Sequence, residues 1–328
     1  MLTFVKDYKK DEGLRQSFDA LAKNTFGISF EAWYQNGCWD DNYITYSFHD
    51  AGKIIANASA NRMTLKIEGL ETPVSAIQIG TVMTDPAYRR KGLAYALIQK
   101  IFDDFDGEVS LYYLAANLEA IPLYEKCGFI EVPETCYHYV ISKASGAFNR
   151  SNNPNRIVSE TESQTSANET HTLRKTALSL EEFIQWKRRA IPKGSQFDVI
   201  DDAHIAAFYW FHGFNDMLYT LGDDCLILAD FSEERQTMTL YEYYMMDKQL
   251  LNESSNQTDE MRLDTIISAV LRMPDRKIEQ IDFAFDVTGM QLMHQPLSSS
   301  EDNRGWMTRS LGELRFPETF CYPKLAQA

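Results

Sequence analysis

The sequence predicts an α/β fold with a mixed, mostly antiparallel sheet, followed by a second α+β domain. Three observations support this. The length of 328 residues suggests two domains at about 150 residues per domain. Helical and strand-like patterns alternate over the first 141 residues. A polar segment then interrupts the chain before a second set of apolar patterns begins. We therefore expect two packed units joined by a linker.

The first unit begins with a helix and continues as strands. Apolar residues recur at helical spacing over residues 14–23. Strand-like runs follow at residues 43–48, 54–58, 63–67 and 76–83, and the Gly-containing turn 49–53 predicts a hairpin. The remaining predicted elements are a helix at 93–105, a strand at 110–115, a short helix at 120–127 and a last strand at 137–141. The strand–helix–strand segment is typical of a right-handed crossover.

The linker is rich in Ser, Asn and Thr, so it buries too little apolar surface to offset the entropy of ordering. The predicted division is residues 1–145, a linker at 146–172 and a second domain at 173–328. In the second domain we expect helices at 180–190, 203–214 and 262–272 and strands at 225–229, 237–244, 278–285 and 307–311. This order is similar to that of the first domain. Asp201 and Asp202 are expected to cap a helix.

Composition and charge exclude several classes of protein. The net charge is −15, divided as −5 up to Lys143 and −10 beyond it, so neither half has the basic field that nucleic-acid binding requires. No apolar run reaches the roughly 18 residues of a membrane helix, and the N-terminus lacks a signal-peptide core. The five scattered cysteines lack zinc-type spacing, so we expect reduced thiols, no metal site and a cytoplasmic location.

The most informative segment is the predicted strand, loop and helix over residues 77–97. The strand ends at Thr84, and Asp85-Pro86 follows. Residues 89–91, Arg-Arg-Lys, then lead into the helix. The first N–H groups of a helix have no intrahelical partner and are free to bind an anion, and Gly92 permits close approach of the backbone. These parts suit a pyrophosphate. The alternative is a solvated cationic loop.

Residues 89–94, Arg-Arg-Lys-Gly-Leu-Ala, fit the Q/R-x-x-G-x-G/A signature of the GNAT superfamily of N-acetyltransferases. Residues 117–129 resemble the family's second motif, with Asn117 after a strand and then Tyr124-x-x-x-Gly128-Phe129. The resemblance covers roughly residues 1–143. In the second domain no Arg-x-x-Gly-x-Gly/Ala motif precedes residue 262. The second domain therefore resembles a degenerate GNAT-like lobe that does not bind CoA. Such a tandem is distantly similar to the Eis-like acetyltransferases, although this chain is shorter than their three-domain plan.

The resemblance implies roles for individual residues. The fourth strand is splayed from the fifth, and its backbone at Val82, Met83 and Thr84 would hold the pantetheine arm and the acetyl carbonyl. The loop and helix start would wrap the pyrophosphate through Arg89, Arg90, Lys91, Gly92, Leu93, Ala94 and Tyr95. Asn117 would bind the pantetheine or orient a water molecule. Tyr124 would protonate the departing CoA thiolate, since a phenol is protonated at pH 7. The alternative for Tyr124 is a helix residue that packs on the sheet.

The acceptor side is less defined. Aromatic residues gather at 30–43 beside Asp40 and Asp41, and Trp33, Tyr34, Trp39 and His49 are the candidate substrate-binding residues. Core packing is the alternative for the aromatic residues, and a turn role is the alternative for His49. His49, Asp85 and solvent are the candidate general bases. His204 and His212 are expected to be packed histidines, because no third metal ligand accompanies them.

These motifs predict an acetyl-CoA-dependent N-acetyltransferase that acts on a primary amine of a small molecule or peptide. A ternary complex with direct attack on the thioester is expected, because no cysteine is placed as a nucleophile. The alternative is a non-catalytic acyl-CoA sensor or interaction scaffold. We expect no nucleic-acid or membrane partner, and a homo-oligomer is compatible with the sequence.

Overall fold

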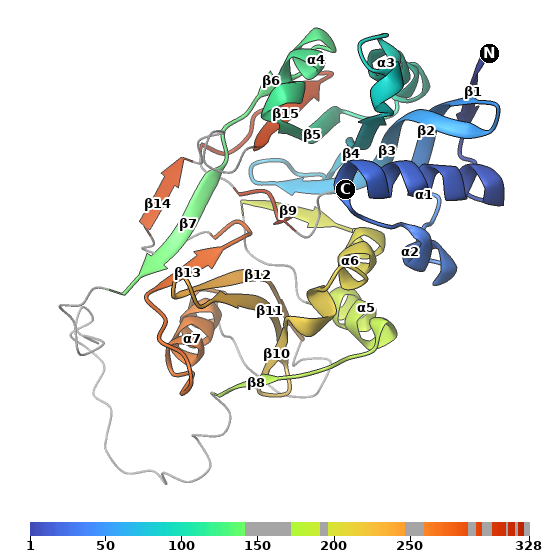
Figure 1. Ribbon diagram of the computed structural model, residues 1–328. Coiled ribbons are helices and arrows are strands. Elements are labelled where there is room, and N and C mark those ends of the chain that lie inside the picture. Colours follow the sequence, from blue (N-terminus) through green and yellow to red (C-terminus); the bar gives the residue numbers. More distant parts are fainter. Residues whose placement is uncertain are drawn as a thin grey trace, which may run out of the picture.

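The computed structural model describes residues 1–141, 172–190, 196–246, 259–287, 293–296, 304–312, 314–318 and 321–324. In these residues two β-sheets lie next to each other, and each sheet has its own helices (Figure 1). The predicted linker at 146–172 lies outside the described residues except for its last position. No helix in the described part of the chain is long and apolar enough to cross a membrane.

The first sheet has the strand order β1-β2-β3-β4-β5-β15-β6, and β9 pairs with the far half of β3. Its strands are β1 (Leu2–Lys6), β2 (Tyr43–Asp50), β3 (Lys53–Ile67), β4 (Val74–Thr84), β5 (Leu111–Asn117), β6 (Ile130–Glu131), β9 (Phe197–Ile200) and β15 (Arg304–Ser310). Its helices are α1 (Glu12–Phe26), α2 (Glu31–Gln35), α3 (Leu93–Phe105) and α4 (Ile121–Lys126), with 3-10 turns η1 (Pro86–Tyr88) and η2 (Leu118–Ala120).

Local sequence signals define the helices of this half. Asp11 caps α1 by accepting a hydrogen bond from the Leu14 N–H at 3.0 Å, and Gly27 ends the helix in the left-handed region. The helix α3 buries Leu97, Ile101 and Phe105 against the sheet, and these side chains belong to the largest apolar cluster of the first half. Packing of α3 therefore fixes where the loop that precedes it lies relative to the sheet.

The second sheet has the strand order β14-β7-β13-β12-β11-β10-β8. Its strands are β7 (Thr135–Val140), β8 (Leu173–Lys175), β10 (Leu218–Leu221), β11 (Cys225–Ser232), β12 (Thr237–Met245), β13 (Gln280–Phe283) and β14 (Met293–Pro296). Its helices are α5 (Leu180–Arg189), α6 (Ala203–Trp210) and α7 (Asp259–Leu271), with the 3-10 turn η3 (Phe214–Asp216). The helix α6 packs against aromatic residues of the first half through Ala207 and Phe208.

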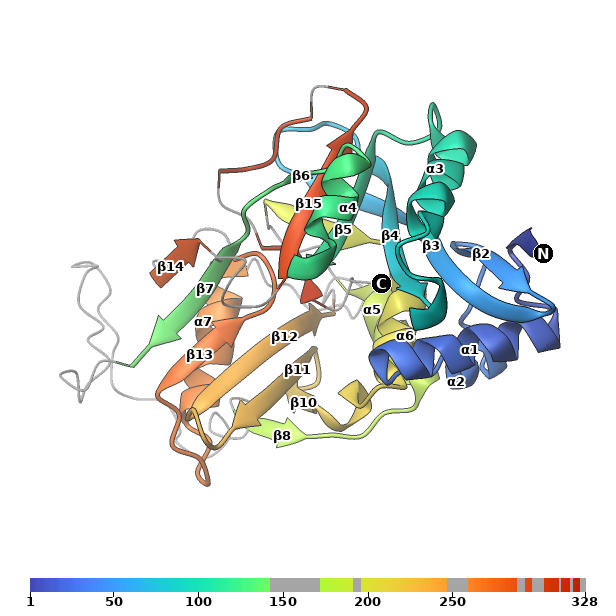
Figure 2. The same cartoon turned by 45° about the horizontal axis from the view of Figure 1, so that its top comes forward.

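The two sheets share one plan, which confirms the prediction of a GNAT-like second unit. The parallel pair β4–β5 is connected through α3, and the parallel pair β12–β13 is connected through α7. In each sheet, the strand that pairs with the outer edge of β5 or of β13 comes from the other half of the chain. The C-terminal strand β15 lies between β5 and β6, whereas β7 lies between β13 and β14 (Figure 2). The two halves have exchanged a strand.

Several predicted elements need correction. The strands predicted at 137–141 and 307–311 are present as β7 and β15, but each was assigned to the wrong sheet. A strand pattern specifies which face is buried and does not specify the partner strand. The runs at 54–58 and 63–67 form the single strand β3. Asp202 lies at the N-cap of α6 without a capping bond, and its carboxylate instead pairs with Lys187 at 2.6 Å.

Candidate functional site

The strands β4 and β5 separate at the centre of the first sheet. They pair only from Ala76↔Leu111 to Gln78↔Tyr113, although β4 continues to Thr84 and β5 continues to Asn117. The outer edge of β5 pairs with β15 along its whole length, so β5 remains held on that side. Beyond Gln78 the β4 backbone groups that face β5 are therefore open to a ligand.

A bulge in β4 lies at the point of separation. Between the pairs Ser59↔Gly80 and Asn57↔Met83 the register with β3 shifts, and Thr81 adopts a φ of +47°. The Asn57 side chain donates a hydrogen bond to the Thr81 carbonyl at 2.8 Å.

A buried chain of polar side chains supports this bond. Ser47 donates to the Asn57 Oδ1 at 2.8 Å, and the Ser47 and Tyr8 hydroxyls are 2.6 Å apart. Ser47 and Asn57 are fully buried. These three side chains were not among the predicted site residues; the alternating polar residues 57, 59 and 61, all buried in β3, are the signal that could have found them.

The cationic loop precedes α3, as predicted. Arg89, Arg90, Lys91 and Gly92 are all exposed. Gly92 caps the helix at a φ of +75°, and a Cβ at this position would meet nothing within 4 Å. The glycine is therefore required by backbone conformation and not by packing.

The start of α3 has free N–H groups. Its first backbone bond runs from the Ala96 N–H to the Gly92 carbonyl, so the N–H groups of Leu93, Ala94 and Tyr95 have no intrahelical partner. In the described part of the chain, Arg90 makes no ion pair or side-chain hydrogen bond. This arrangement can bind an anionic group such as a pyrophosphate.

Asn117 is the last residue of β5, and Tyr124 lies on α4, which follows β5 along the chain. Tyr124 on α4 is 6% exposed, and burial raises its pKa, so the phenol keeps its proton at neutral pH. No hydrogen-bond partner of its hydroxyl lies among the described residues. Burial likewise raises the pKa of Cys127 to about 11, and its thiol is a poor nucleophile at neutral pH.

A cavity of about 460 Å³ lies at the separated strands and is lined by both Tyr124 and Asn117; we call it the apolar cavity. Four residues predicted for the site line it: Trp33, Val82, Asn117 and Tyr124. The rest of its lining is Phe26, Ile28, Phe30, Tyr43, Ile79, Gly80, Thr81, Ala115, Ala120, Ile205, Phe208, Tyr209, His212 and Phe214. The last five of these come from α6 and the residues after it. Sequence reasoning did not assign them to the site, because nothing local shows where α6 packs.

The other three substrate candidates lie elsewhere, as does the side chain of Met83, a residue predicted to bind the pantetheine arm. Trp39 is buried in the aromatic cluster behind Trp33, and the ring of Tyr34 lies 3.9 Å from the Arg15 guanidinium carbon. His49 lies at the hairpin turn, where its Nδ1 accepts a hydrogen bond from the Gly52 N–H. Met83 is buried at 2% exposure. None of these four residues lines the apolar cavity.

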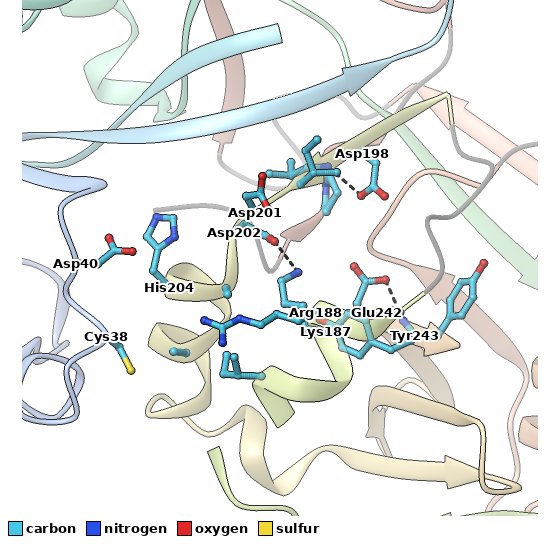
Figure 3. A pocket seen from close by; sticks show the side chains of 18 of the residues that line it. Cys38, Asp40, Lys187, Arg188, Asp198, Asp201, Asp202, His204, Glu242 and Tyr243 are labelled. Atoms are coloured by element: carbon cyan, nitrogen blue, oxygen red, sulfur yellow. Dashed lines mark hydrogen bonds and ion pairs between the residues drawn. The ribbon is translucent and has the colours of Figure 1, made fainter. Parts of the chain in front are cut away.

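The carboxylates that were grouped with the aromatic residues do not lie beside them in the apolar cavity. Asp41 pairs with Lys9 at 2.8 Å. Asp40 lines a second cavity of about 570 Å³ on the other side of α6, which we call the polar cavity (Figure 3). There the buried ion pair of Lys187 and Asp202 faces the cavity, and the Nε2 of His204 bonds Asn61 at 2.7 Å.

The polar cavity also contains Glu242 from the end of β12, beyond the last β12–β13 pair at Leu240↔Phe283. The polar cavity therefore lies beyond the end of the β12–β13 pairing, as the apolar cavity lies beyond the end of the β4–β5 pairing. The segment 246–258, between β12 and α7, contains no glycine and so lacks the Arg-x-x-Gly motif of residues 89–92; its residues 247–258 lie outside the described residues. The phosphate-binding features are present in the first sheet alone among the described residues.

Comparison with known proteins agrees with this geometry. Residues 12–132 match the family model described as an acetyltransferase (GNAT) domain. This segment is a GNAT domain. The separated strands β4 and β5, the cationic loop and α4 all lie within the matched residues. Residues 1–11 and the exchanged strands β7 and β15 lie outside them. Acyl transfer is the activity of this family.

Solved structures resemble nearly the whole chain. Eis1 from Mycobacterium abscessus has a TM-score of 0.55 at 14% identity, with coverage of 94% of this chain and 71% of that one. A GCN5-related N-acetyltransferase from Anabaena variabilis has a TM-score of 0.54 at 14% identity, over 94% and 73% of the two chains. One from Kribbella flavida has a TM-score of 0.53 at 12% identity, over 95% and 72%. These likenesses show the fold, with the GNAT domain and the second lobe together. No curated protein matches the sequence significantly.

Proposed function

We propose that the chain is an acetyl-CoA-dependent N-acetyltransferase that transfers acetyl to a primary amine of a small molecule or peptide. One observation carries the proposal: the separated strands β4 and β5 and Tyr124 line one cavity, and the cationic loop follows β4 directly along the chain. We assign residues 1–145 to the GNAT domain, 146–172 to the linker and 173–328 to the second lobe, apart from the exchanged strands.

In this proposal the residues of the loop and of the helix start hold the CoA pyrophosphate, namely Arg89, Arg90, Lys91, Gly92, Leu93, Ala94 and Tyr95. The backbone of Val82, Met83 and Thr84 binds the pantetheine arm along the unpaired edge of β4. N–H groups of this edge stabilise the oxyanion that forms on the acetyl carbonyl during attack. Asn117 at the end of β5 binds the pantetheine or orients a water molecule.

The acceptor amine attacks the thioester directly in a ternary complex. The nitrogen bonds to the acetyl carbon, the C–S bond breaks, and Tyr124 donates its proton to the departing thiolate. The raised pKa of Cys127 supports direct attack, because a protonated thiol at that position does not form an acyl-enzyme intermediate. The apolar and aromatic lining favours an amine whose neighbouring groups are apolar.

A non-catalytic acyl-CoA sensor is the second candidate. A sensor would need the phosphate loop but would have no use for a protonated phenol facing the site of the thiolate. The position of Tyr124 in the cavity lining therefore favours the enzyme.

The first experiment measures thermal stabilisation by acetyl-CoA for the wild type, Arg90→Glu and Gly92→Glu. A ligand at about 100 times its Kd contributes about 2.7 kcal/mol, which raises the melting temperature clearly. We expect a shift in the wild type that both variants lose, since each places a carboxylate where the pyrophosphate binds. CoA release with a panel of amines then separates the two functions: binding without release indicates the sensor, and no binding contradicts both.

A further inference from the structure

In the proposed acetyl transfer the acceptor amine must lose a proton. The need for a residue that accepts this proton rests on that proposed function. Among the described residues that line the apolar cavity, none carries a carboxylate or an ammonium group. The titratable groups of the lining are the phenols of Tyr43, Tyr124 and Tyr209 and the imidazole of His212. Burial raises the pKa of Tyr43 to about 12, so this phenol is not a base at neutral pH. His212 is the one described lining residue with an imidazole, a side chain that can accept a proton through a ring nitrogen.

His212 follows the end of α6, in the second lobe, and its ring is half-buried. Its Nδ1 lies 2.7 Å from the Phe208 carbonyl oxygen, and the two rings pack with centroids 4.2 Å apart. A carbonyl can only accept a hydrogen bond, so Nδ1 carries the proton. In the neutral ring this leaves the lone pair on Nε2 as the atom that can accept a proton. The bond to Phe208 therefore defines both the tautomer and the ring position.

The other candidate bases are engaged elsewhere. His49 lies at the hairpin turn with its Nδ1 bound to the Gly52 N–H, and it does not line the apolar cavity. His204 lies on the polar-cavity side of α6, and its Nε2 is bonded to Asn61. Asp85 pairs with Lys53 at 2.6 Å and caps η1 through the Ala87 N–H.

We propose that His212 is the general base of the acetyl transfer, so that the second lobe completes the active site of the first. As the amine nitrogen bonds to the acetyl carbon, its proton passes to Nε2 of His212. The C–S bond breaks, and the thiolate takes the proton of Tyr124. The proton on His212 then returns to Tyr124 through solvent, which leaves the amide, free CoA and the enzyme in its initial protonation state.

The test compares wild type, His212→Asn and the control His138→Asn in the full chain, with the amine found in the panel above. Asparagine keeps an N–H donor for the Phe208 carbonyl but cannot accept a proton at neutral pH. His138 lies on β7 in the second sheet and does not line the apolar cavity. The three proteins are compared for the acetyl-CoA shift in melting temperature and for kcat as a function of pH.

We expect His212→Asn to keep the acetyl-CoA shift and to lose about 100-fold in kcat at pH 7, within the usual range for a general base. The deficit should shrink as pH rises and the amine deprotonates in solution. His138→Asn should behave as the wild type. A fourth protein, His212→Ala, removes the whole ring, and added imidazole should restore part of its activity.

An unchanged kcat in His212→Asn would overturn the role of His212. A deficit in His212→Asn that is equal at all pH values, together with no imidazole rescue of His212→Ala, would also overturn it. Both results require an active wild type, so they leave the proposed acetyl transfer intact. A wild type that binds acetyl-CoA and acetylates no amine instead contradicts the proposed function, and the role of His212 falls with it.

Discussion

At the scale of single residues, the chemistry of the site depends on protonation states that burial controls. Tyr124 and Cys127 both lie on or beside α4, and burial raises the pKa of each. For the phenol this retains the proton that acid catalysis requires. For the thiol it suppresses the thiolate that covalent catalysis would require. The same physical effect therefore favours one mechanism and opposes the other.

Replacing Tyr124 with Phe tests the acid role directly. We expect kcat to fall about 10- to 100-fold, the low end of general-acid effects, because CoA then leaves as an unprotonated thiolate. The acetyl-CoA shift in melting temperature should be unchanged, since the ring still packs. Tyr112→Phe is the matched control, because its hydroxyl bonds Asp106 at 2.8 Å outside the cavity. Full activity in Tyr124→Phe would reject this residue as the acid.

At the scale of elements, the separation of β4 and β5 depends on a conformation that is unfavourable by itself. Thr81 has a β-branched side chain and a positive φ, a combination that costs about 1–3 kcal/mol and persists only where the surroundings enforce it. The enforcing contacts come from the neighbouring strands, through Asn57 on β3 and Tyr43 on β2. The binding edge is thus held in place before any ligand arrives.

Asn57→Ala removes the central bond of this network. We expect the free energy of unfolding to fall by about 1–3 kcal/mol, because the Thr81 carbonyl loses its donor and the buried Ser47 hydroxyl loses its acceptor. Acetyl-CoA should also bind more weakly, because β4 is less strongly held in the open conformation. Urea unfolding and the acetyl-CoA shift measure the two effects. Asn36→Ala removes only an exposed hydrogen bond, from the Asn36 side chain to the Ala32 carbonyl, and should change stability by no more than about 0.5 kcal/mol. Wild-type values of both quantities in Asn57→Ala would show that the bulge does not depend on this bond.

At the scale of the whole molecule, the exchanged strands make each half depend on the other. The strand β15 covers the outer edge of β5 along its length, and Trp306 on β15 packs beside Tyr113 at 3% exposure. The strand β9 likewise extends the first sheet along β3. Without the C-terminal half, β5 would present an unpaired edge and an uncovered apolar surface.

A chain of residues 1–145 should therefore fail to fold alone. We expect it to aggregate or to unfold without a cooperative transition, because β5 lacks β15 and β7 lacks β13. Co-expression of residues 1–145 with 173–328 should restore a soluble complex that acetyl-CoA stabilises, since both exchanged strands are then supplied. Size-exclusion chromatography and thermal unfolding provide the readouts. A stable, monomeric 1–145 fragment that binds acetyl-CoA as the full chain does would contradict the dependence.

Helices, helix caps and glycine turns could be predicted from the sequence alone, because each depends on residues that are close together along the chain. The helix predicted at 93–105 coincides with α3, and the loop before it has the conformation that Gly92 permits. Helix periodicity, capping and glycine conformations depend on residues a few positions apart, so they can be read along the chain.

The pairing of the strands and the residues that close the apolar cavity could be seen only in the tertiary structure. Strand patterns have a period of two and name no partner, so the exchange of β7 and β15 could not be read from them. His212 reaches the cavity because α6 packs on the aromatic residues of the first half. There the Trp33 side chain donates to the His204 carbonyl at 2.7 Å, across 171 positions of sequence. Contacts of this range depend on the packing of the complete fold, which no local pattern encodes.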